Sequence, residues 1–320
     1  MRKLGVVLFV LAALLGWQAP ASAQAYPTRT IQIIVPFAAG TLTDVMTRTI
    51  GKALSDRIGQ PVVIDNRPGA AGNLGVAAAA KAAPDGYTLL MGTNGPMAAN
   101  RALYKSLPFD PVKDFVPVIH TVTAPLVMIA GTQVPVRTVQ DVVQFARANP
   151  GKLNFGVTNT TGRVWVELLK KMAGVQVEII TYQGPAPMLA DLIGGRIQMS
   201  VENVAPVLAM IQSNKVTGVA LMNPKRAPYA PDLPALAESG YTQYDVVGWL
   251  GIFVPQGTSQ EIVRRLNREL AASLASPEVV SVITRSGIPG GGTPEQLADL
   301  QKRDLALWAE VAESAGLRAE

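Results

Sequence analysis

Beyond residue 30, short apolar runs alternate with amphipathic stretches, and this alternation predicts strands and helices in turn. Runs such as Ile31–Val35 are almost wholly apolar, which is typical of strands in sheets that helices cover on both faces. The pattern therefore indicates parallel α/β sheets. The expected strands are Ile31–Val35, Val62–Ile64, Thr88–Met91, Leu126–Ala130, Glu178–Thr181, Met199–Val201 and Val216–Leu221, and the expected helices are Asp44–Arg57, Val139–Ala148, Arg163–Met172, Met188–Ile193, Gln260–Ala275 and Pro294–Ala315.

The first 23 residues follow a different pattern. A charged start, Met1-Arg2-Lys3, precedes an apolar run over Leu4–Trp17 and the small residues Ala21-Ser22-Ala23. This is the order of a secretory signal, and the apolar run is shorter than the roughly 20 residues that span a bilayer. We expect cleavage after Ala23 and a soluble periplasmic protein. Because no cysteine follows the cleavage site, we expect no lipid anchor of the bacterial lipoprotein type.

Composition excludes several kinds of site. The 320 residues are 48% hydrophobic and 16% charged, which fits a globular protein of about two domains. The absence of cysteine and the single histidine, His120, exclude disulfides, thiolate zinc sites and multi-histidine metal sites. Losing Arg2 and Lys3 with the signal lowers the formal charge from +5, so the balance is nearly neutral and gives no support for a nucleic-acid partner. We expect no metal and no cofactor.

Loops that follow expected strands carry the groups that a carboxylate needs. Open α/β sheets bind ligands beyond the carboxyl ends of their strands. In the first such loop, residues 36–44, small residues open a helix whose free N–H groups would favour an anion. Hydroxyls and a guanidinium follow in the loops at 157–163 and 182–185, and both groups donate hydrogen bonds. The candidate residues are Phe37, Ala39, Gly40, Thr41, Asp44, Thr93, Asn94, Thr158, Thr160, Thr161, Arg163, Gln183 and Gly184.

Each of these loops also has an ordinary structural interpretation. Thr43 or Thr160 could cap a helix, which is worth about 1 kcal/mol without any ligand. Asp44 suits the positive end of a helix dipole, and Arg163 suits a helix surface. Only convergence of the loops in space would make a site, and the sequence alone does not show convergence.

Longer stretches of the chain resemble a known family. Val35-Pro36-Phe37-Ala38-Ala39-Gly40, the segment 59–73 (GQPVVIDNRPGAAGN) and Ala83-Pro84-Asp85-Gly86-Tyr87-Thr88 are similar to the Bug-type periplasmic solute receptors of tripartite tricarboxylate transporters. The resemblance continues through residues 153–156, 182–187, 191–198 and 249–255. It therefore covers essentially the whole chain after the signal.

This resemblance implies a fold and a function. The fold would be the two-lobed type II periplasmic-binding-protein fold, with two crossovers and a ligand cleft between the lobes. We expect one lobe from residues 24–124 plus 225–320 and the other from 125–224. The protein would capture a small carboxylate without chemical change and deliver it, as a monomer, to the membrane subunits of a transporter. One carboxyl would be held by the loop at residues 37–44.

Departures from the family pattern bear on specificity. Thr41 stands where a second glycine is common, and Arg163 replaces a frequent histidine. A frequent aspartate corresponds approximately to Glu202 or Asn203, which join the candidate residues. Because arginine can clamp a second carboxylate with two hydrogen bonds, we expect a dicarboxylate. Phe37, Tyr182 and Trp165 could flank an aromatic ligand such as terephthalate, although a core or surface role suits Trp165 better.

Two rival functions remain open on the sequence alone. His120 with Asp110 or Asp114 could perform acid–base catalysis, but no nucleophile elbow, phosphate loop or metal motif accompanies them. Alternatively, the same receptor fold could present its ligand to a signalling histidine kinase instead of a transporter. We expect a receptor and not an enzyme.

Overall fold

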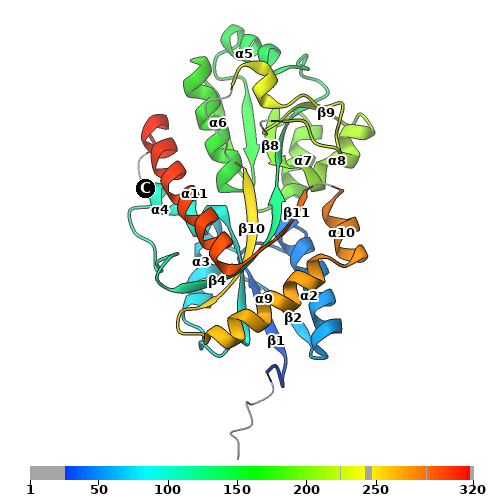
Figure 1. Ribbon diagram of the computed structural model, residues 1–320. Helices are drawn as coiled ribbons and strands as arrows, with labels where there is room; N and C mark the ends of the chain where they lie inside the picture. The colour runs from blue at the N-terminus through cyan, green and yellow to red at the C-terminus, as the bar shows by residue number, and fades with distance from the viewer. Residues whose placement is uncertain (1–25, 224, 242–246, 286, 318–320) are drawn as a thin grey trace, which may run out of the picture.

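The structure is a computed structural model that describes residues 26–223, 225–241, 247–285 and 287–317 (Figure 1). The expected signal segment, residues 1–23, lies outside this part of the chain. Across these described ranges, none of the helices has the length and apolar character needed to cross a membrane.

Two sheets form two lobes, which Figure 1 shows one above the other. The strand order is β11-β4-β10-β3-β1-β2 in the lower sheet and β7-β6-β8-β5-β9 in the upper sheet. The lower strands are β1 (Ile31–Val35), β2 (Val62–Asn66), β3 (Thr88–Thr93), β4 (Phe115–Ala124), β10 (Gly248–Pro255) and β11 (Ile288–Gly291), and the upper strands are β5 (Leu126–Gly131), β6 (Asn154–Val157), β7 (Glu178–Thr181), β8 (Met199–Asn203) and β9 (Val216–Leu221).

Both sheets are mixed, which corrects the expectation of parallel sheets. β1 pairs in parallel with β2 and β3, and β6 pairs in parallel with β7 and β8. In contrast, β10 runs antiparallel to β3 and β4, and β5 runs antiparallel to β8 and β9. β5 and β10 are the strands by which the chain enters each sheet from the other lobe. The alternation of strand and helix does not predict their direction.

Helices cover both faces of each sheet, as the near-continuous apolar strands predicted. In the lower lobe, α2, α9 and α10 pack on one face and α3 and α11 on the other. In the upper lobe, α5 and α6 cover one face and α7 and α8 the other. The helices are α2 (Leu42–Ile58), α3 (Asn73–Ala80), α4 (Asn100–Leu103), α5 (Val139–Ala148), α6 (Thr160–Ala173), α7 (Pro185–Ile193), α8 (Val204–Gln212), α9 (Gln260–Leu274), α10 (Pro277–Ile283) and α11 (Pro294–Ala315), with short turns η1 (Ala70–Gly72), η2 (Gly95–Ala99) and η3 (Leu236–Ser239).

The chain passes from the lower to the upper lobe at Pro125, the single residue between β4 and β5. The segment after β9 stays with the upper lobe, because Ala227, Ala230 and Leu233 pack into its apolar cluster. These apolar residues recur every three positions, and they pack against the upper lobe. The packing therefore differs from the expected assignment of residues 225–239 to the lower lobe, and the precise lobe limits remain a proposal.

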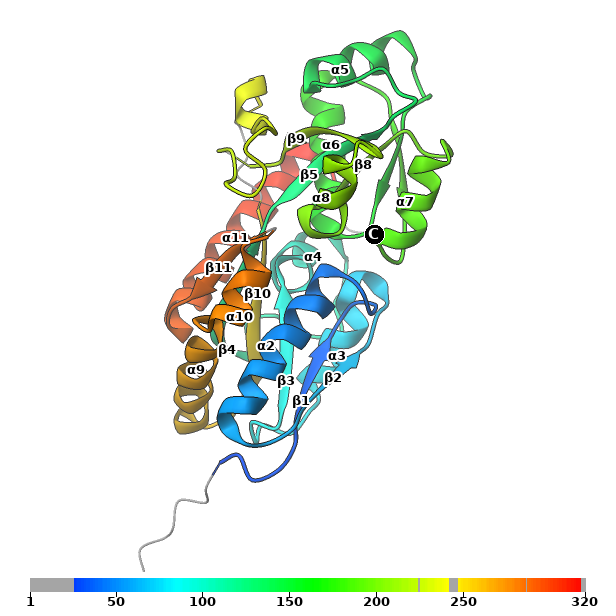
Figure 2. The same ribbon diagram turned by 90° about the vertical axis from the view of Figure 1, so that its right-hand side faces the viewer.

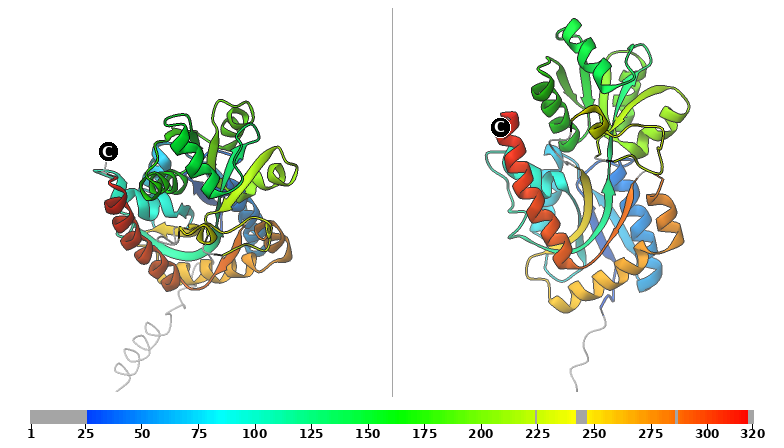
Figure 3. Two further views of the ribbon diagram at one scale, coloured as in Figure 1. Left: turned by 90° about the horizontal axis from the view of Figure 1, so that it is seen from above. Right: turned by 45° about the horizontal axis from the view of Figure 1, so that its top comes forward.

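Further contacts tie the lobes together beside the crossovers. α11 begins on the lower sheet and runs towards the upper lobe (Figures 2 and 3). Its residues Trp308 and Val311 belong to the apolar cluster around α6. Gly248, the first residue of β10, pairs with Ala124, the last residue of β4. A Cβ atom on Gly248 would lie 2.6 Å from the carbonyl oxygen of Ala124, so the close approach of the two crossovers requires glycine here.

We predict that Gly248→Ala destabilises the protein. The added methyl group would meet backbone that cannot rotate away, and such overpacking costs about 1–3 kcal/mol in the free energy of unfolding. Gly95→Ala is the matched control, since the atom nearest to its Cβ, Thr160 Oγ1, lies at an ordinary 3.4 Å. Urea unfolding measures both variants. Equal stability of the two variants would contradict the close approach at the crossover.

Candidate functional site

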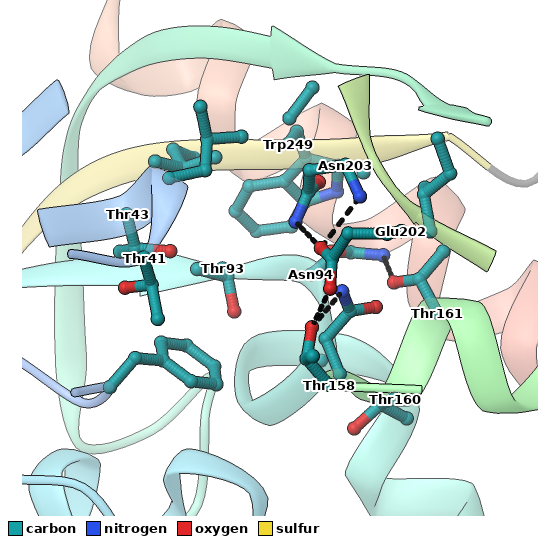
Figure 4. A pocket seen from close by; sticks show the side chains of 18 of the residues that line it. Thr41, Thr43, Thr93, Asn94, Thr158, Thr160, Thr161, Glu202, Asn203 and Trp249 are labelled. Atoms are coloured by element: carbon teal, nitrogen blue, oxygen red, sulfur yellow. Dashed lines mark hydrogen bonds between the residues drawn. The ribbon is translucent and has the colours of Figure 1, made fainter. Parts of the chain in front are cut away.

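A cavity lies between the two lobes and is lined from both (Figure 4). It holds about 620 Å³ of empty space, part of it open to solvent. The lower lobe lines the cavity with Phe37, Thr41-Leu42-Thr43 at the start of α2, Thr93-Asn94-Gly95 after β3, Ala124 at the end of β4, and Gly248, Trp249 and Leu250 of β10. The upper lobe lines it with Thr158-Asn159-Thr160-Thr161 at the start of α6 and with Leu126, Pro185, Glu202, Asn203 and Pro206.

The loop that leads into α2 is held by its own polar groups. The Thr41 hydroxyl donates to the Ala38 carbonyl at 2.8 Å and accepts from the Asp44 N–H, so Thr41 caps the helix. The Asp44 carboxylate accepts from the Gly40 N–H at 2.9 Å and from Asn66 at 2.9 Å, and it pairs with Arg48 at 2.9 Å. Burial alone would raise the pKa of Asp44, but the hydrogen bonds from Arg48, Gly40 and Asn66 outweigh it and lower that pKa.

The start of α6 is built in the same way. Asn159 caps the helix, because its side-chain oxygen accepts from the Gly162 N–H at 2.9 Å. A Cβ atom on Gly162 would lie 2.6 Å from the Val201 carbonyl oxygen. Glycine at position 162 therefore lets the first turn of α6 pack directly on β8. The start of α6 and the end of β8 therefore line the same cavity.

Two helix starts thus face one cavity from opposite lobes. The first N–H groups of a helix have no partner within the helix, and they carry partial positive charge. The cap residues take up the third N–H in each helix, that of Asp44 in α2 and that of Gly162 in α6. The N–H groups of Leu42 and Thr43 in α2, and of Thr160 and Thr161 in α6, lie in segments that line the cavity. This arrangement suits an anion such as a carboxylate.

Hydrogen bonds between side chains join the lobes at the edge of this cavity. Asn94 of the lower lobe donates from its amide to the Thr161 hydroxyl at 2.9 Å, a bond drawn in Figure 4. The Thr160 hydroxyl donates to the side-chain oxygen of Asn100 at 3.2 Å. Both bonds connect the start of α6 to the segment that follows β3. A relative movement of the lobes that separates these segments would have to break both.

Glu202 is the one ionisable side chain among the described residues that line this cavity. Only 2% of it is exposed to solvent. It accepts hydrogen bonds from the Thr158 hydroxyl and from the backbone N–H and side-chain amide of Asn203, the latter two at 2.7 and 3.1 Å. Burial raises the pKa of Glu202, and these bonds offset the effect only in part.

A second cavity adjoins the first. The two cavities share one wall, which is formed by Phe37, Thr158, Asn159 and Thr160. Arg163, Tyr182 and Gln183 line the second cavity, which holds about 1040 Å³ of empty space, part of it open to solvent. Arg163 follows Thr160 by three residues on α6 and, unlike Thr160, lines only the second of these two cavities.

The structure brings most of the expected residues together. Nine of them line the first cavity: Phe37, Thr41, Thr93, Asn94, Thr158, Thr160, Thr161, Glu202 and Asn203. Arg163 and Gln183 line the second cavity. Ala39, Gly40, Asp44 and Gly184 line neither of these two cavities.

Several expectations change in detail. The helix caps are Thr41 and Asn159, not Thr43 and Thr160. Asp44 braces the loop before α2 through the bonds described above, which is a structural role. Trp165 is buried in the apolar cluster of the upper lobe, so the core interpretation of this residue is confirmed and it does not flank either cavity.

Sequence reasoning missed three residues of the cavity lining that have polar side-chain groups. Thr43 and Asn159 stand within the loops that the sequence singled out, and a shift of one or two residues in the expected caps hid them. Trp249 comes from β10, and its indole N–H donates to Asp304 at 2.6 Å. The motif that begins at Trp249 was visible as a family resemblance, but nothing in it shows that the strand returns to the cleft.

The groups of the catalytic alternative lie elsewhere. His120 is on β4, where burial lowers the pKa of its imidazole, and its Nε2 lies 3.4 Å from the Thr123 hydroxyl. Neither His120 nor Asp110 or Asp114 lines the two cavities. Within the described ranges, no three side chains of the metal-ligating kinds lie close enough together to hold an ion.

Known proteins are similar to this chain in sequence and in fold. The family described as "Tripartite tricarboxylate transporter family receptor" matches residues 46–317. Protein BugT of Bordetella pertussis is 34% identical over 322 residues, which cover 99% of each chain.

Two solved structures are similar over nearly their whole length. An R. palustris protein solved with adipate has a TM-score of 0.88 and 36% identity, covering 92% of this chain and 100% of that one. MatC from Rhodopseudomonas palustris, with bound malate, has a TM-score of 0.83 and 28% identity, covering 89% of this chain and 99% of that one. The expected two-lobed periplasmic-binding-protein fold is thereby confirmed. The chain belongs to the receptor family of tripartite tricarboxylate transporters, whose members are periplasmic solute-binding receptors and not enzymes.

Proposed function

We propose that this receptor captures a small dicarboxylate between its lobes and delivers it to the membrane subunits of a tripartite tricarboxylate-type transporter. The observation that carries the proposal is the pair of helix starts, α2 and α6, which face the first cavity from opposite lobes. Their N–H groups offer hydrogen bonds and partial positive charge without a formal cation. One carboxylate of the ligand would lie between them.

The second cavity offers a place for the other carboxylate. It shares Phe37 and the segment 158–160 with the first cavity, so a short carbon chain can run from one to the other along these residues. Arg163 lines the second cavity, and a guanidinium can hold a carboxylate by two parallel hydrogen bonds. The adipate and malate of the two similar structures are both dicarboxylates, which supports this class of ligand.

An aromatic dicarboxylate fits the same description. Phe37 and Tyr182 both line the second cavity, and their rings could flank a flat ligand. Terephthalate therefore stays among the candidate ligands. Only Phe37 and Tyr182 would flank it, because Trp165 is buried in the core.

Ligand binding should favour a closed arrangement of the lobes. A ligand that contacts both lobes stabilises the closed state by the difference between its affinities for the closed and open states. We propose that the protein works as a monomer in the periplasm after its signal is removed behind Ala23, and that the closed form is what the transporter recognises.

A thermal-shift screen tests the proposed function. The screen compares linear, hydroxylated and aromatic mono-, di- and tricarboxylates, with adipate, malate and terephthalate among them. A ligand at about 100 times its dissociation constant adds roughly 2.7 kcal/mol to the free energy of unfolding, so a true ligand gives a clear rise in Tm. We expect the largest rise from a dicarboxylate. No rise with any carboxylate would contradict the proposal.

We predict that Arg163→Ala weakens a dicarboxylate much more than the matching monocarboxylate. Adipate and hexanoate are a suitable pair, since they differ only in the distal carboxylate. Arg163 is exposed in the ligand-free protein, so its pair with the distal carboxylate would be buried only when a ligand fills the cavity. Truncating one partner of a charge pair that is buried in the complex costs about 2–5 kcal/mol, which raises the dissociation constant of adipate about 30-fold to several thousand-fold. Hexanoate lacks the distal group, so its affinity should change only a few-fold. Calorimetry measures both ligands.

Lys171→Ala is the control for this prediction, because it removes an exposed positive charge from the same helix. It should leave both affinities unchanged. Equal losses for adipate and hexanoate in Arg163→Ala would assign Arg163 a structural role. No loss for either ligand would exclude Arg163 from the site.

A further inference from the structure

A buried carboxyl group lies in the cavity that we propose for a carboxylate ligand. Glu202 is 2% exposed, and no other ionisable side chain is found among the described residues of the cavity lining. Two carboxylates in one cavity repel each other, and no cation of the lining described here compensates. The proposed function therefore requires an account of how Glu202 and an anionic ligand share this space.

The hydrogen bonds of Glu202 distinguish its two oxygens. Oε1 accepts two bonds, from the backbone N–H and the side-chain amide of Asn203 at 2.7 and 3.1 Å. Oε2 accepts from the Thr158 hydroxyl, as Figure 4 shows. A proton on Oε1 would displace at least one donor. A proton on Oε2 costs no bond, because the Thr158 hydroxyl can accept as well as donate.

Thr158 lines both cavities and donates its hydroxyl hydrogen to Glu202 Oε2. When Glu202 is ionised, the Thr158 hydrogen points at Oε2, and the hydroxyl offers only lone pairs to a ligand. When Oε2 carries a proton, Oε2 donates to the Thr158 oxygen, and the Thr158 hydrogen becomes available to the ligand. Protonation thus removes a negative charge and turns Thr158 into a donor for an anion.

The elements that pack against β8 bring no cation to Glu202. β5, β6 and α8 contain no ionisable residue. The charged groups of the other neighbouring elements do not line the first cavity. α6 carries Arg163, which lines the second cavity, the ion pair of Glu167 and Lys170 at 2.9 Å, and the exposed Lys171. α7 carries Asp191, which pairs with Arg196 at 3.0 Å. In the lower lobe, Asp44 pairs with Arg48, and Asp304 accepts the hydrogen bond of the Trp249 indole.

We propose that Glu202 takes up one proton from solvent when a carboxylate binds in the first cavity, and that the Thr158 hydroxyl then donates to the bound carboxylate. This inference rests on the proposed function and adds a regulation of the same site by pH. Burial already raises the pKa of Glu202 in the free protein. A bound anion raises it further, since a second negative charge disfavours the ionised form.

Proton uptake makes the affinity depend on pH. Between the pKa of Glu202 in the free protein and its higher pKa in the complex, the dissociation constant rises about tenfold for each unit of pH. Below the lower of these two values, Glu202 is already protonated, and the affinity becomes independent of pH. Capture would therefore be strongest at acidic pH and would weaken as the pH rises.

Calorimetry in buffers of different ionisation enthalpy counts the protons taken up on binding. The probe is adipate, or the dicarboxylate that gives the largest thermal shift, at pH 6.5–9, where both of its carboxyl groups are ionised. For the unmodified protein we expect an uptake that approaches one proton per ligand at pH values between the pKa of Glu202 in the free protein and its higher pKa in the complex. The affinity should fall in step with this uptake.

Glu202→Gln is the decisive variant. The glutamine amide donates to Thr158 permanently, while its oxygen still accepts from Asn203, so the variant mimics the protonated form. We expect no proton uptake, an affinity that does not change with pH, and tighter binding than the unmodified protein at pH 9. Glu178→Gln, an exposed change on β7, is the control and should keep the full proton uptake.

Three results would overturn the inference while leaving the proposed function intact. Binding without proton uptake in the unmodified protein would show that Glu202 does not change its charge. Equal proton uptake in Glu202→Gln would assign the proton to another group. Weaker binding of Glu202→Gln at every pH would show that the ionised form of Glu202, and not its protonated form, supports ligand binding. Absence of carboxylate binding in all variants would instead contradict the proposed function itself, and this inference with it.

A ligand-free measurement tests the same group independently. Because the folded-state pKa of Glu202 is raised, its neutral form stabilises the fold at low pH, and this contribution is lost as the pH rises through the raised pKa. The Tm of the unmodified protein should therefore fall relative to that of Glu202→Gln as the pH rises from 4.5 to 9. A constant difference across this range would contradict a buried, titrating carboxyl group at position 202.

Discussion

The starts of α2 and α6 face one cavity from opposite lobes, and the rest of the account depends on this arrangement. A helix start leaves N–H groups without partners inside the chain, and these groups need an acceptor from water or from a ligand. In each lobe, the loop before the helix is fixed by a cap, Thr41 in one and Asn159 in the other. An anion that enters the cavity can satisfy both helix starts at once, which links ligand capture to the relative position of the lobes.

The two cavities differ in the charged groups that they would offer to a ligand. The first has neutral donors and one buried carboxyl, Glu202, while the second has Arg163. In the proposed function, a carboxylate in the first cavity would be recognised by hydrogen bonds and helix dipoles, whose strength depends on the exclusion of water. The Asp44 carboxylate looked like a ligand contact in sequence, but it is occupied by Gly40, Asn66 and Arg48. It shapes the loop that the ligand would meet.

The sequence predicted which loops form the candidate site, but it did not predict the role of each side chain within them. Apolar strands followed by small and hydroxylated residues identified the segments around Thr41 and Thr160, because this pattern is local. A local pattern does not show which hydroxyl caps a helix, so the caps were expected one or two residues too late. Trp249 was missed because only the course of β10, after the chain returns from the upper lobe, brings it to the cleft. The assignment of residues 225–239 to a lobe likewise depended on long-range packing.

A crystal structure of the protein with adipate tests the central claim most directly, because it shows which groups contact each carboxylate. The account predicts one carboxylate in the first cavity, within hydrogen-bonding distance of the first N–H groups of α2 and α6, and the other in the second cavity beside Arg163. A ligand bound by one lobe alone, or bound outside both cavities, would contradict it.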